Sequence, residues 1–236
     1  MDKIVINTDK MNPSEEYVCW LDIMGTKSSM SESFEKSANF ILRFHTAVLK
    51  AGTSKKIRVY PVMDGVYVVV KKLEDMIAFI NRVMTSLAEV FLSEQNNHRF
   101  IVKGALAKGT LQHGSKISSE VSSDIAPKVG YKQHLLFGMP MIQAFNTEKN
   151  APPFGIYIHE SARTVKGLQG RYYFWHRDEE ISDNADLQKQ LKAALLEFLK
   201  WEKERHYYFE LESAKFAEYE ERVQEFFTMI EDWPMK

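Results

Sequence analysis

Apolar and polar positions along the chain predict short strands that alternate with amphipathic helices. Residues 17–24 and 57–70 are rich in aromatic and β-branched residues, a composition typical of buried strands. The second range contains Met63-Asp64-Gly65 between its two apolar halves, and Asp-Gly in such a position predicts a hairpin. Across residues 33–49 and 74–92, apolar residues recur at helical spacing, which predicts two amphipathic helices.

The second half of the chain continues the pattern with further strand signals. Strands are predicted within residues 100–109 and 111–115, and a short strand, a glycine turn and a helix within 135–151. Two more strands are predicted within 155–162 and 170–177. The resulting order, βαββαββαββ, predicts an α+β sandwich whose sheet is antiparallel.

The tail, from about residue 185 to residue 231, differs because it is highly charged and contains neither proline nor glycine. Its apolar residues recur at helical spacing in two stripes, and a bend between two helices is predicted at residues 206–208. The stripes can pack on the core of the same chain or on a second copy of it. Their members are Leu191, Leu195, Phe198 and Leu199, then Phe216, Tyr219, Val223, Phe226 and Ile230.

Composition narrows the class of protein. The 236 residues are 44% hydrophobic, which suffices for one core with a helical appendage. A net charge of −1 gives no basic field, so no nucleic-acid partner is expected. The single cysteine, Cys19, argues against a disulfide framework and for a reducing compartment. Because no apolar run approaches ~20 residues and residues 1–16 lack a secretory signal, we expect a cytoplasmic chain without a membrane partner.

Two aspartates at the ends of apolar runs are the main candidates for chemistry. Asp22 stands three residues before Gly25, and Asp64 stands directly before Gly65. A carboxylate in an apolar run is costly unless its charge is compensated, and two at neighbouring strand ends can share a divalent cation. Oxygen ligands favour Mg²⁺ or Mn²⁺, an arrangement typical of phosphoryl transfer. The alternative is that both are turn aspartates, since Asp-Gly is common in hairpins.

Four segments, in this order, resemble the class III nucleotidyl cyclases. WLDIMG and VMDGVYV are similar to the family's two metal-binding segments, VKGALAKGTLQHG to its strand-turn-strand, and LLFGMPMIQAFNTEKNA to its strand-glycine-helix. The resemblance covers residues 17 to 175 and implies a ferredoxin-like α+β catalytic domain, predicted over 17–180. An N-terminal extension (1–16) and a C-terminal helical extension (185–236) flank it. Family members act as homodimers with composite active sites.

The resemblance also implies roles for particular residues. Asp22 and Asp64 take the places of the metal aspartates, and the backbone carbonyl of Ile23 that of a third ligand. The amides of Met24-Gly25-Thr26-Lys27 would cradle the β- and γ-phosphates, as helix N-termini do. Two Mn²⁺ or Mg²⁺ ions would lower the pKa of the ribose 3′-hydroxyl and hold the triphosphate. Attack of the 3′-oxygen on the α-phosphorus would give a 3′,5′-cyclic nucleotide in a phosphorus–oxygen lyase reaction.

Two positions depart from purine cyclases where the base is read. Tyr60 stands four residues before Asp64, where purine cyclases have Lys or Glu, and Leu135 takes the second base-reading position. Neither can act as the family's purine readers do, and a smaller pocket suits a pyrimidine. This resembles the Pycsar-type bacterial cyclases, which make cyclic UMP or cyclic CMP in anti-phage defence. UTP is favoured over CTP by this resemblance alone, and Tyr60 can instead be a cross-strand packing residue.

A third departure concerns the transition state. The family's Asn and Arg would fall on Ile142 and Asn146, neither of which can perform the same task. If the chain is active, another cation must stabilise the transferring phosphate, and it can come from the partner chain. Two further hypotheses stay open: a degenerate cyclase-like module that binds nucleotide or protein without turnover, and a purine cyclase with unusual base reading. Candidates for the missing cation are Lys103, Lys149, Lys166 and Arg171.

Overall fold

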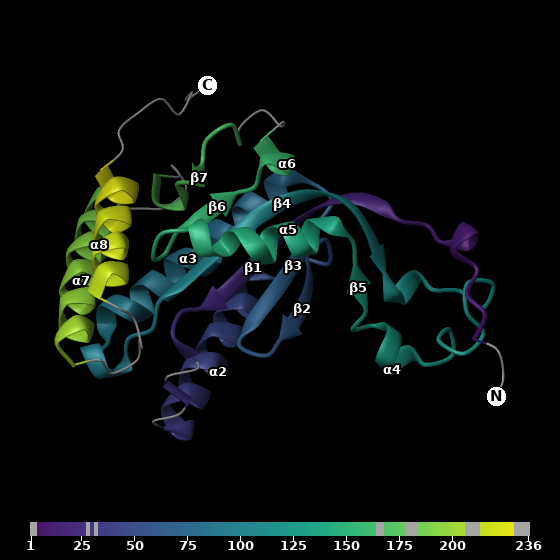
Figure 1. Ribbon diagram of the computed structural model, residues 1–236, viewed down its shortest axis with the longest axis horizontal. Helices are drawn as coiled ribbons and strands as arrows, with labels where there is room; N and C mark the ends of the chain where they lie inside the picture. Colours follow the sequence, from purple (N-terminus) through teal and green to yellow (C-terminus); the bar gives the residue numbers. More distant parts are fainter. Residues whose placement is uncertain are drawn as a thin grey trace.

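The computed structural model describes residues 4–26, 29–30, 33–163, 168–177, 184–205 and 213–228. A central sheet runs through it in the order β2-β3-β1-β4-β6-β7, and β5 pairs with the far end of β4 (Figure 1). The strands are β1 (Ser14–Ile23), β2 (Arg58–Val62), β3 (Gly65–Val70), β4 (Val102–His113), β5 (Leu136–Phe137), β6 (Ile156–Ile158) and β7 (Tyr172–Tyr173).

The sheet is mixed, so the prediction of an antiparallel sheet is wrong in one pair. β6 lies parallel to β4, with Gly104 opposite Ile156, while the other described pairs are antiparallel. The chain reaches β6 through the helix α5 (Met139–Thr147), and a crossover of this kind returns a strand in the same direction.

Helices cover both faces of the sheet. α2 (Phe34–Ala51) and α3 (Leu73–Ser93) lie on one face, and both were predicted to within two residues at each end. The Ser33 side chain accepts a hydrogen bond from the amide of Lys36, which caps the start of α2. α5 lies on the other face (Figure 1). Shorter helices are α4 (Val129–Lys132), α6 (Glu160–Arg163), η1 (Thr8–Lys10), η2 (Asn96–His98), η3 (Gly114–Lys116), η4 (Glu148–Asn150) and η5 (Trp175–Arg177).

Alternation along β1 divides the apolar residues between two cores. Cys19 and Leu21 point into the main core, with α2, α3 and the C-terminal helices, and neither is exposed. Val18 and Trp20 point into the second core, beneath α5. By the same alternation Asp22 lies on the α5 side of the sheet.

Strand predictions in the second half were only partly right. Residues 102–113 form one continuous strand, β4, where two strands and a turn were predicted. Gly109 instead leaves room for α5, because an added Cβ would lie 2.9 Å from the Pro140 side chain. β7 is only two residues long because Trp175 turns into the core, where its indole donates a 2.7 Å hydrogen bond to the Phe154 carbonyl.

The tail forms two helices, α7 (Asn184–Arg205) and α8 (Ser213–Thr228), that lie side by side at one end of the molecule (Figure 1). Both pack on the main core, so the described stripe residues follow the first of the two predicted alternatives. The ring centroids of Phe198 and Phe91 of α3 lie 5.5 Å apart, and those of Phe226 and His176 lie 5.0 Å apart. The predicted bend at 206–208 and Ile230 lie outside the described residues.

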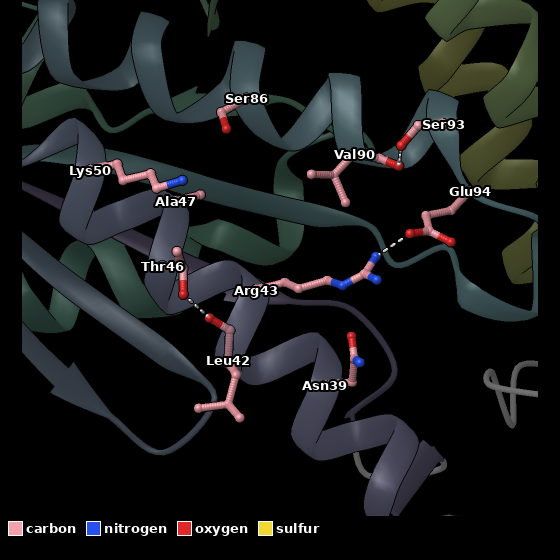
Figure 2. A pocket seen from close by; sticks show the side chains of 10 residues that line it. All are labelled: Asn39, Leu42, Arg43, Thr46, Ala47, Lys50, Ser86, Val90, Ser93 and Glu94. Carbon is pink, nitrogen blue, oxygen red and sulfur yellow. Dashed lines mark hydrogen bonds and ion pairs between the residues drawn. The ribbon is translucent and has the colours of Figure 1, made fainter.

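A groove of about 460 Å³ separates α2 from α3 on the face away from α5 (Figure 2). The guanidinium of Arg43 on α2 reaches across it to the carboxylate of Glu94, just beyond α3. α3 is also the one helix, among the residues described, whose length and composition would allow it to cross a membrane. One face of α3, which includes Phe79 and Met84, is fully buried, which is the pattern of a core helix.

Candidate active site

Strand pairing brings Asp22 and Asp64 to the same end of the sheet. β1 and β3 pair up to Leu21 and Val66, so Asp22 emerges beside the β2–β3 hairpin that carries Asp64. The hairpin was predicted, but its turn is formed by Met63 and Asp64 rather than by Asp64 and Gly65, because Gly65 already pairs with Val62 as the first residue of β3.

The glycine of the Asp-Gly pair serves packing and not the turn. A Cβ on Gly65 would lie 2.4 Å from the ring of Trp20 on β1, so only glycine fits there. Met63, in contrast, has a φ of 54°, which is unusual for a residue with a side chain. Its side chain is 87% exposed, so the turn that presents Asp64 projects into solvent.

The carboxylate of Asp22 is only partly satisfied by hydrogen bonds. Its Oδ1 atom is buried and has no hydrogen-bond partner among the described residues. Burial, with the charges of Asp64 and Glu148, raises the pKa of Asp22 to about 7. The Ile23 amide and Lys103 counter this only in part. The two aspartates therefore lie close enough to repel each other, and a cation between them would relieve the repulsion.

The donor set at this end of the sheet suits a hard divalent cation. Carboxylate and carbonyl oxygens are the ligands that Mg²⁺ and Mn²⁺ prefer. No group of three or more His, Cys, Asp or Glu side chains that could hold a metal ion occurs among the described residues. The protein would thus supply few ligands, as is usual for Mg²⁺ bound together with substrate phosphates.

The segment after Asp22 turns sharply into a short helical stretch. Gly25 has a φ of 77°, a conformation that glycine adopts without strain. The carbonyl of Ile23, the predicted third metal ligand, accepts a 3.2 Å hydrogen bond from the Thr26 hydroxyl. The Met24 amide donates to the carbonyl of Ile101, so the amide of this residue is already engaged. Lys27 lies outside the described residues.

One of the candidate cations lies beside Asp22. Lys103 on β4 is directly opposite Asp22 in the register, and it is buried. Its Nζ forms a 3.1 Å ion pair with Glu148 and lies 5.7 Å from the ring centroid of Tyr219 on α8. Lys103 is therefore near the aspartates but held by Glu148 rather than directed at them.

The other candidate cations lie elsewhere or are not described. Lys149 is exposed, and its carbonyl accepts a 2.7 Å hydrogen bond from Arg222 of α8. Arg171 is exposed, with its guanidinium 5.3 Å from the ring centroid of Tyr172. Lys166 lies outside the described residues. Of the three candidates that the structure describes, Lys103 alone is brought to Asp22 within one chain.

Tyr60 belongs to a buried polar chain that the sequence did not predict. Its hydroxyl lies 2.6 Å from Nδ1 of His113, whose Nε2 lies 3.0 Å from a carboxylate oxygen of Glu16. A carboxylate only accepts, so Nε2 carries the proton and Nδ1 accepts from Tyr60. Burial lowers the pKa of His113, which keeps the imidazole neutral at pH 7. Tyr60 is thus anchored by its own chain, and its role at a base stays a prediction.

The remaining predicted positions lie just before β5 and on α5. Leu135 packs beside Gly114, whose amide donates a 2.8 Å hydrogen bond to the Leu135 carbonyl. Ile142 and Asn146 both lie on the exposed side of α5. Their side chains therefore face solvent or a partner.

Two charged groups were missed by the sequence analysis. Glu148 acts on Asp22 and binds Lys103, although it follows α5 in a polar stretch without any motif. Glu16 binds His113 across 97 positions of sequence. The sequence signal for Glu16 was limited to its position directly before the apolar run at residues 17–24, and Glu148 had no sequence signal.

Comparison with known proteins supports the fold and leaves the sequence family open. No protein-family model matches the sequence, and no curated protein matches it. Among solved structures, the guanylyl cyclase Cya2 is similar with a TM-score of 0.50 and 15% identity, over 65% of this chain and 79% of Cya2. The adenylyl cyclase CyaB from P. aeruginosa is similar with a TM-score of 0.50 and 13% identity, over 66% of this chain and 81% of CyaB.

A eukaryotic cyclase gives the same result. The monomeric guanylyl cyclase domain of the RhoGC fusion protein from the aquatic fungus Blastocladiella emersonii has a TM-score of 0.50 and 14% identity. That match covers 65% of this chain and 86% of the domain. The chain therefore has the α+β fold of a class III cyclase catalytic domain, with a C-terminal helical part added to it.

Proposed function

We propose that the chain is a pyrimidine nucleotide cyclase that converts UTP to 3′,5′-cyclic UMP and pyrophosphate, with CTP and cyclic CMP as the alternative pair. The observation that carries this proposal is the convergence of Asp22 and Asp64 at one end of a cyclase-type sheet, where a buried Asp22 oxygen has no partner within the described ranges. By its resemblance to Pycsar-type cyclases, the chain is expected to act in bacterial anti-phage signalling.

In this reaction the bonds that form and break all belong to the substrate. A bond forms between the ribose 3′-oxygen and the α-phosphorus, and the bond from that phosphorus to the bridging oxygen of the β-phosphate breaks, so pyrophosphate leaves with the electron pair. Asp22, Asp64 and the Ile23 carbonyl would hold two Mn²⁺ or Mg²⁺ ions, which lower the pKa of the 3′-hydroxyl and offset charge on the leaving group when bound. Within the predicted segment 24–27, the amides after Met24 would position the triphosphate, because the Met24 amide is bonded to the Ile101 carbonyl.

Tyr60 supports a small base rather than a purine. Its bulky ring has no charge with which to read a purine, and its hydroxyl is engaged by His113. Leu135 offers no hydrogen bond from its side chain. The choice between UTP and CTP rests on the family resemblance.

A homodimer with composite active sites is part of this proposal. α5 exposes three large apolar side chains, Met139, Ile142 and Phe145, each more than half accessible. Exposed apolar surface of this kind is typical of an interface. Because Lys103 is held by Glu148, a cation from the second chain would fit the missing transition-state role.

A second candidate function is favoured by the substitutions on α5. Ile142 and Asn146 lack the groups that orient the ribose and stabilise the phosphate in the family. A chain with this fold and these residues can bind nucleotide without turning it over. Metal-dependent release of pyrophosphate separates the two functions.

The experiment that tests the proposal is incubation of the purified chain with Mn²⁺ and each of ATP, GTP, CTP and UTP, followed by mass analysis of the products. Cyclic UMP or cyclic CMP that disappears in Asp22→Ala would support a pyrimidine cyclase and identify the base. Cyclic AMP or cyclic GMP instead would retain the cyclase and overturn the assignment of the base. No cyclic product together with measurable nucleotide binding would favour the degenerate module.

A further inference from the structure

A cavity of about 310 Å³ lies at the opposite end of the β2–β3 hairpin from Asp64. It is bounded by the loop after α2, the start of β2, the end of β3 and the first turn of α3. Five of its lining side chains are cationic and two are anionic, in a chain whose overall net charge is −1. We call it the basic pocket; its lining residues are Glu16, Lys55, Lys56, Arg58, Lys71, Lys72 and Asp75.

The fold itself brings these cations together. β2 and β3 are antiparallel, with Arg58 opposite Val69, so Arg58 at the start of β2 lies beside Lys71 and Lys72 just beyond β3. The loop that holds Lys55 leads directly into β2. Like charges gathered around one cavity repel each other, and the repulsion is relieved when an anion binds.

The two carboxylates of the pocket are already engaged. Asp75 lies 3.7 Å from Lys56, and Glu16 accepts hydrogen bonds from Ser14 and from His113. Arg58 interacts with the Tyr60 hydroxyl and with the charge of Glu16, but its Nη1 atom is buried and has no hydrogen-bond partner among the described residues. A guanidinium nitrogen buried in this way is a strong donor for a phosphate or carboxylate oxygen.

Two further features favour phosphate over other anions. α3 begins at Leu73, immediately after Lys72, and Lys72 offers no side-chain cap to the first amides of the helix. Those amides add positive potential to the same region, and Glu74 and Asp75 in the first turn of α3 offset part of it. Lysines and an arginine around a small cavity match several phosphate oxygens at once.

We propose that the basic pocket binds the phosphate groups of a small polyphosphate ligand. The pocket and Asp64 are separated by the six residues of β3, or about 20 Å along an extended strand. The pocket therefore lies apart from the carboxylate end of the same chain. The inference stands whether or not the chain is a cyclase.

The test is isothermal titration of the full chain with inorganic tripolyphosphate, and in a second arm with UTP. Both are run at low salt in EDTA, so that no divalent ion can bridge phosphate to Asp22 and Asp64. Lys71→Ala/Lys72→Ala should weaken tripolyphosphate binding at least tenfold, and Lys55→Ala/Lys56→Ala should weaken it severalfold. The matched control is Lys128→Ala/Lys189→Ala, which removes two exposed lysines far from the pocket and should change the affinity less than twofold.

The two arms distinguish the sources of the phosphate. Equal affinities for tripolyphosphate and UTP would mean that phosphate alone is recognised, whereas much tighter UTP binding that is lost in Lys71→Ala/Lys72→Ala would identify a nucleotide. The proposal is overturned if the wild-type chain binds neither, or if the control pair loses as much affinity as the pocket pairs. Unchanged melting temperatures of the variants exclude misfolding as the cause.

Discussion

Glu16 and Asp22 lie six residues apart on β1 and on the same side of the sheet, yet their surroundings are opposite in kind. Burial raises the pKa of Glu16, but hydrogen bonds from Ser14 and His113 outweigh it, and the net pKa is lowered. Asp22 has a buried oxygen with no partner among the residues that the structure describes, and burial with nearby negative charges raises its pKa to about 7. The fold satisfies the Glu16 carboxylate internally and leaves one oxygen of Asp22 without a hydrogen-bond partner in the described part of the chain. Hydrogen-bond partners, rather than burial, therefore distinguish the two carboxylates.

The largest expected effect follows from removing the carboxylate of Asp64, which lies beside Asp22. Asp64→Ala should lower nucleotide cyclisation more than about 10³-fold, because a divalent ion contributes several kcal/mol to the transition state. Asp124→Ala, which removes an exposed loop carboxylate, should leave the rate unchanged. Product formation and thermal unfolding are measured together. A variant that loses its fold as well would mark Asp64 as a structural turn residue.

Removing the satisfied carboxylate should affect stability instead. Glu16→Ala leaves buried partners unpaired and should cost about 3 kcal/mol of unfolding free energy in urea titrations. Its neighbour Glu15 points to the other side, where it pairs with Lys108 at 3.6 Å and is largely exposed. Glu15→Ala should therefore cost less than about 1 kcal/mol. Equal costs for the two variants would contradict the comparison.

The pH dependence of the Glu16 contribution has a definite sign. The pKa of Glu16 in the folded chain is lowered from its ordinary value of 4.5. The stabilisation from the ionised Glu16 is therefore fully present above pH 4.5 and is lost as the pH falls through the folded pKa. The difference between wild type and Glu16→Ala should therefore shrink in acid.

Asp22 should show the opposite behaviour in metal-free buffer. Its folded pKa is raised from 3.8 to about 7, so the fold prefers the protonated acid and loses stability as the pH rises through that window. Asp22→Asn should therefore be more stable than wild type by on the order of 4 kcal/mol at pH 8, and equal to it at pH 3. Glu16→Gln, measured in parallel, should be less stable than wild type. If Asp22→Asn were less stable than wild type at pH 8, the ionised Asp22 carboxylate would not be unfavourable to the fold.

A divalent ion must compete with the proton on Asp22. One pH unit below a pKa of about 7, about a tenth of the carboxyl is ionised, so the Mn²⁺ concentration needed to raise the melting temperature should be about tenfold higher at pH 6 than at pH 8. Scanning calorimetry with increasing Mn²⁺ measures this. Asp22→Asn should show no such dependence, and a wild-type response independent of pH would speak against metal binding at Asp22.

The smallest effect concerns the other end of the polar chain. Tyr60→Phe removes the hydroxyl that donates a hydrogen bond to His113. It should lower the free energy of unfolding by about 1 kcal/mol while leaving product choice unchanged. Tyr60→Ala also removes the ring volume and should shift the products toward cyclic purine nucleotides, as measured by mass analysis. Unaltered selectivity in Tyr60→Ala would make Tyr60 a packing residue.

Elements with strong periodicity were predictable, while contacts between distant segments were not. The α2 and α3 helices and the hairpin follow from local patterns, and the sequence also located both aspartates at strand ends. The parallel pairing of β6 and the displaced turn at Met63 depend on packing against α5 and Trp20. The Glu148–Lys103 pair and the Tyr60–His113–Glu16 chain join residues far apart in sequence. No periodicity encodes such partners.

Cys19 lies on β1 between the two contrasted carboxylates and faces the main core. Burial raises the pKa of its thiol, and only the thiolate reacts readily with alkylating reagents. Modification of the chain's one cysteine therefore requires β1 to separate from its neighbours, and the labelling rate reports the free energy of that opening. A ligand that binds at either end of β1 would slow the labelling, which gives a measure of occupancy that needs no turnover.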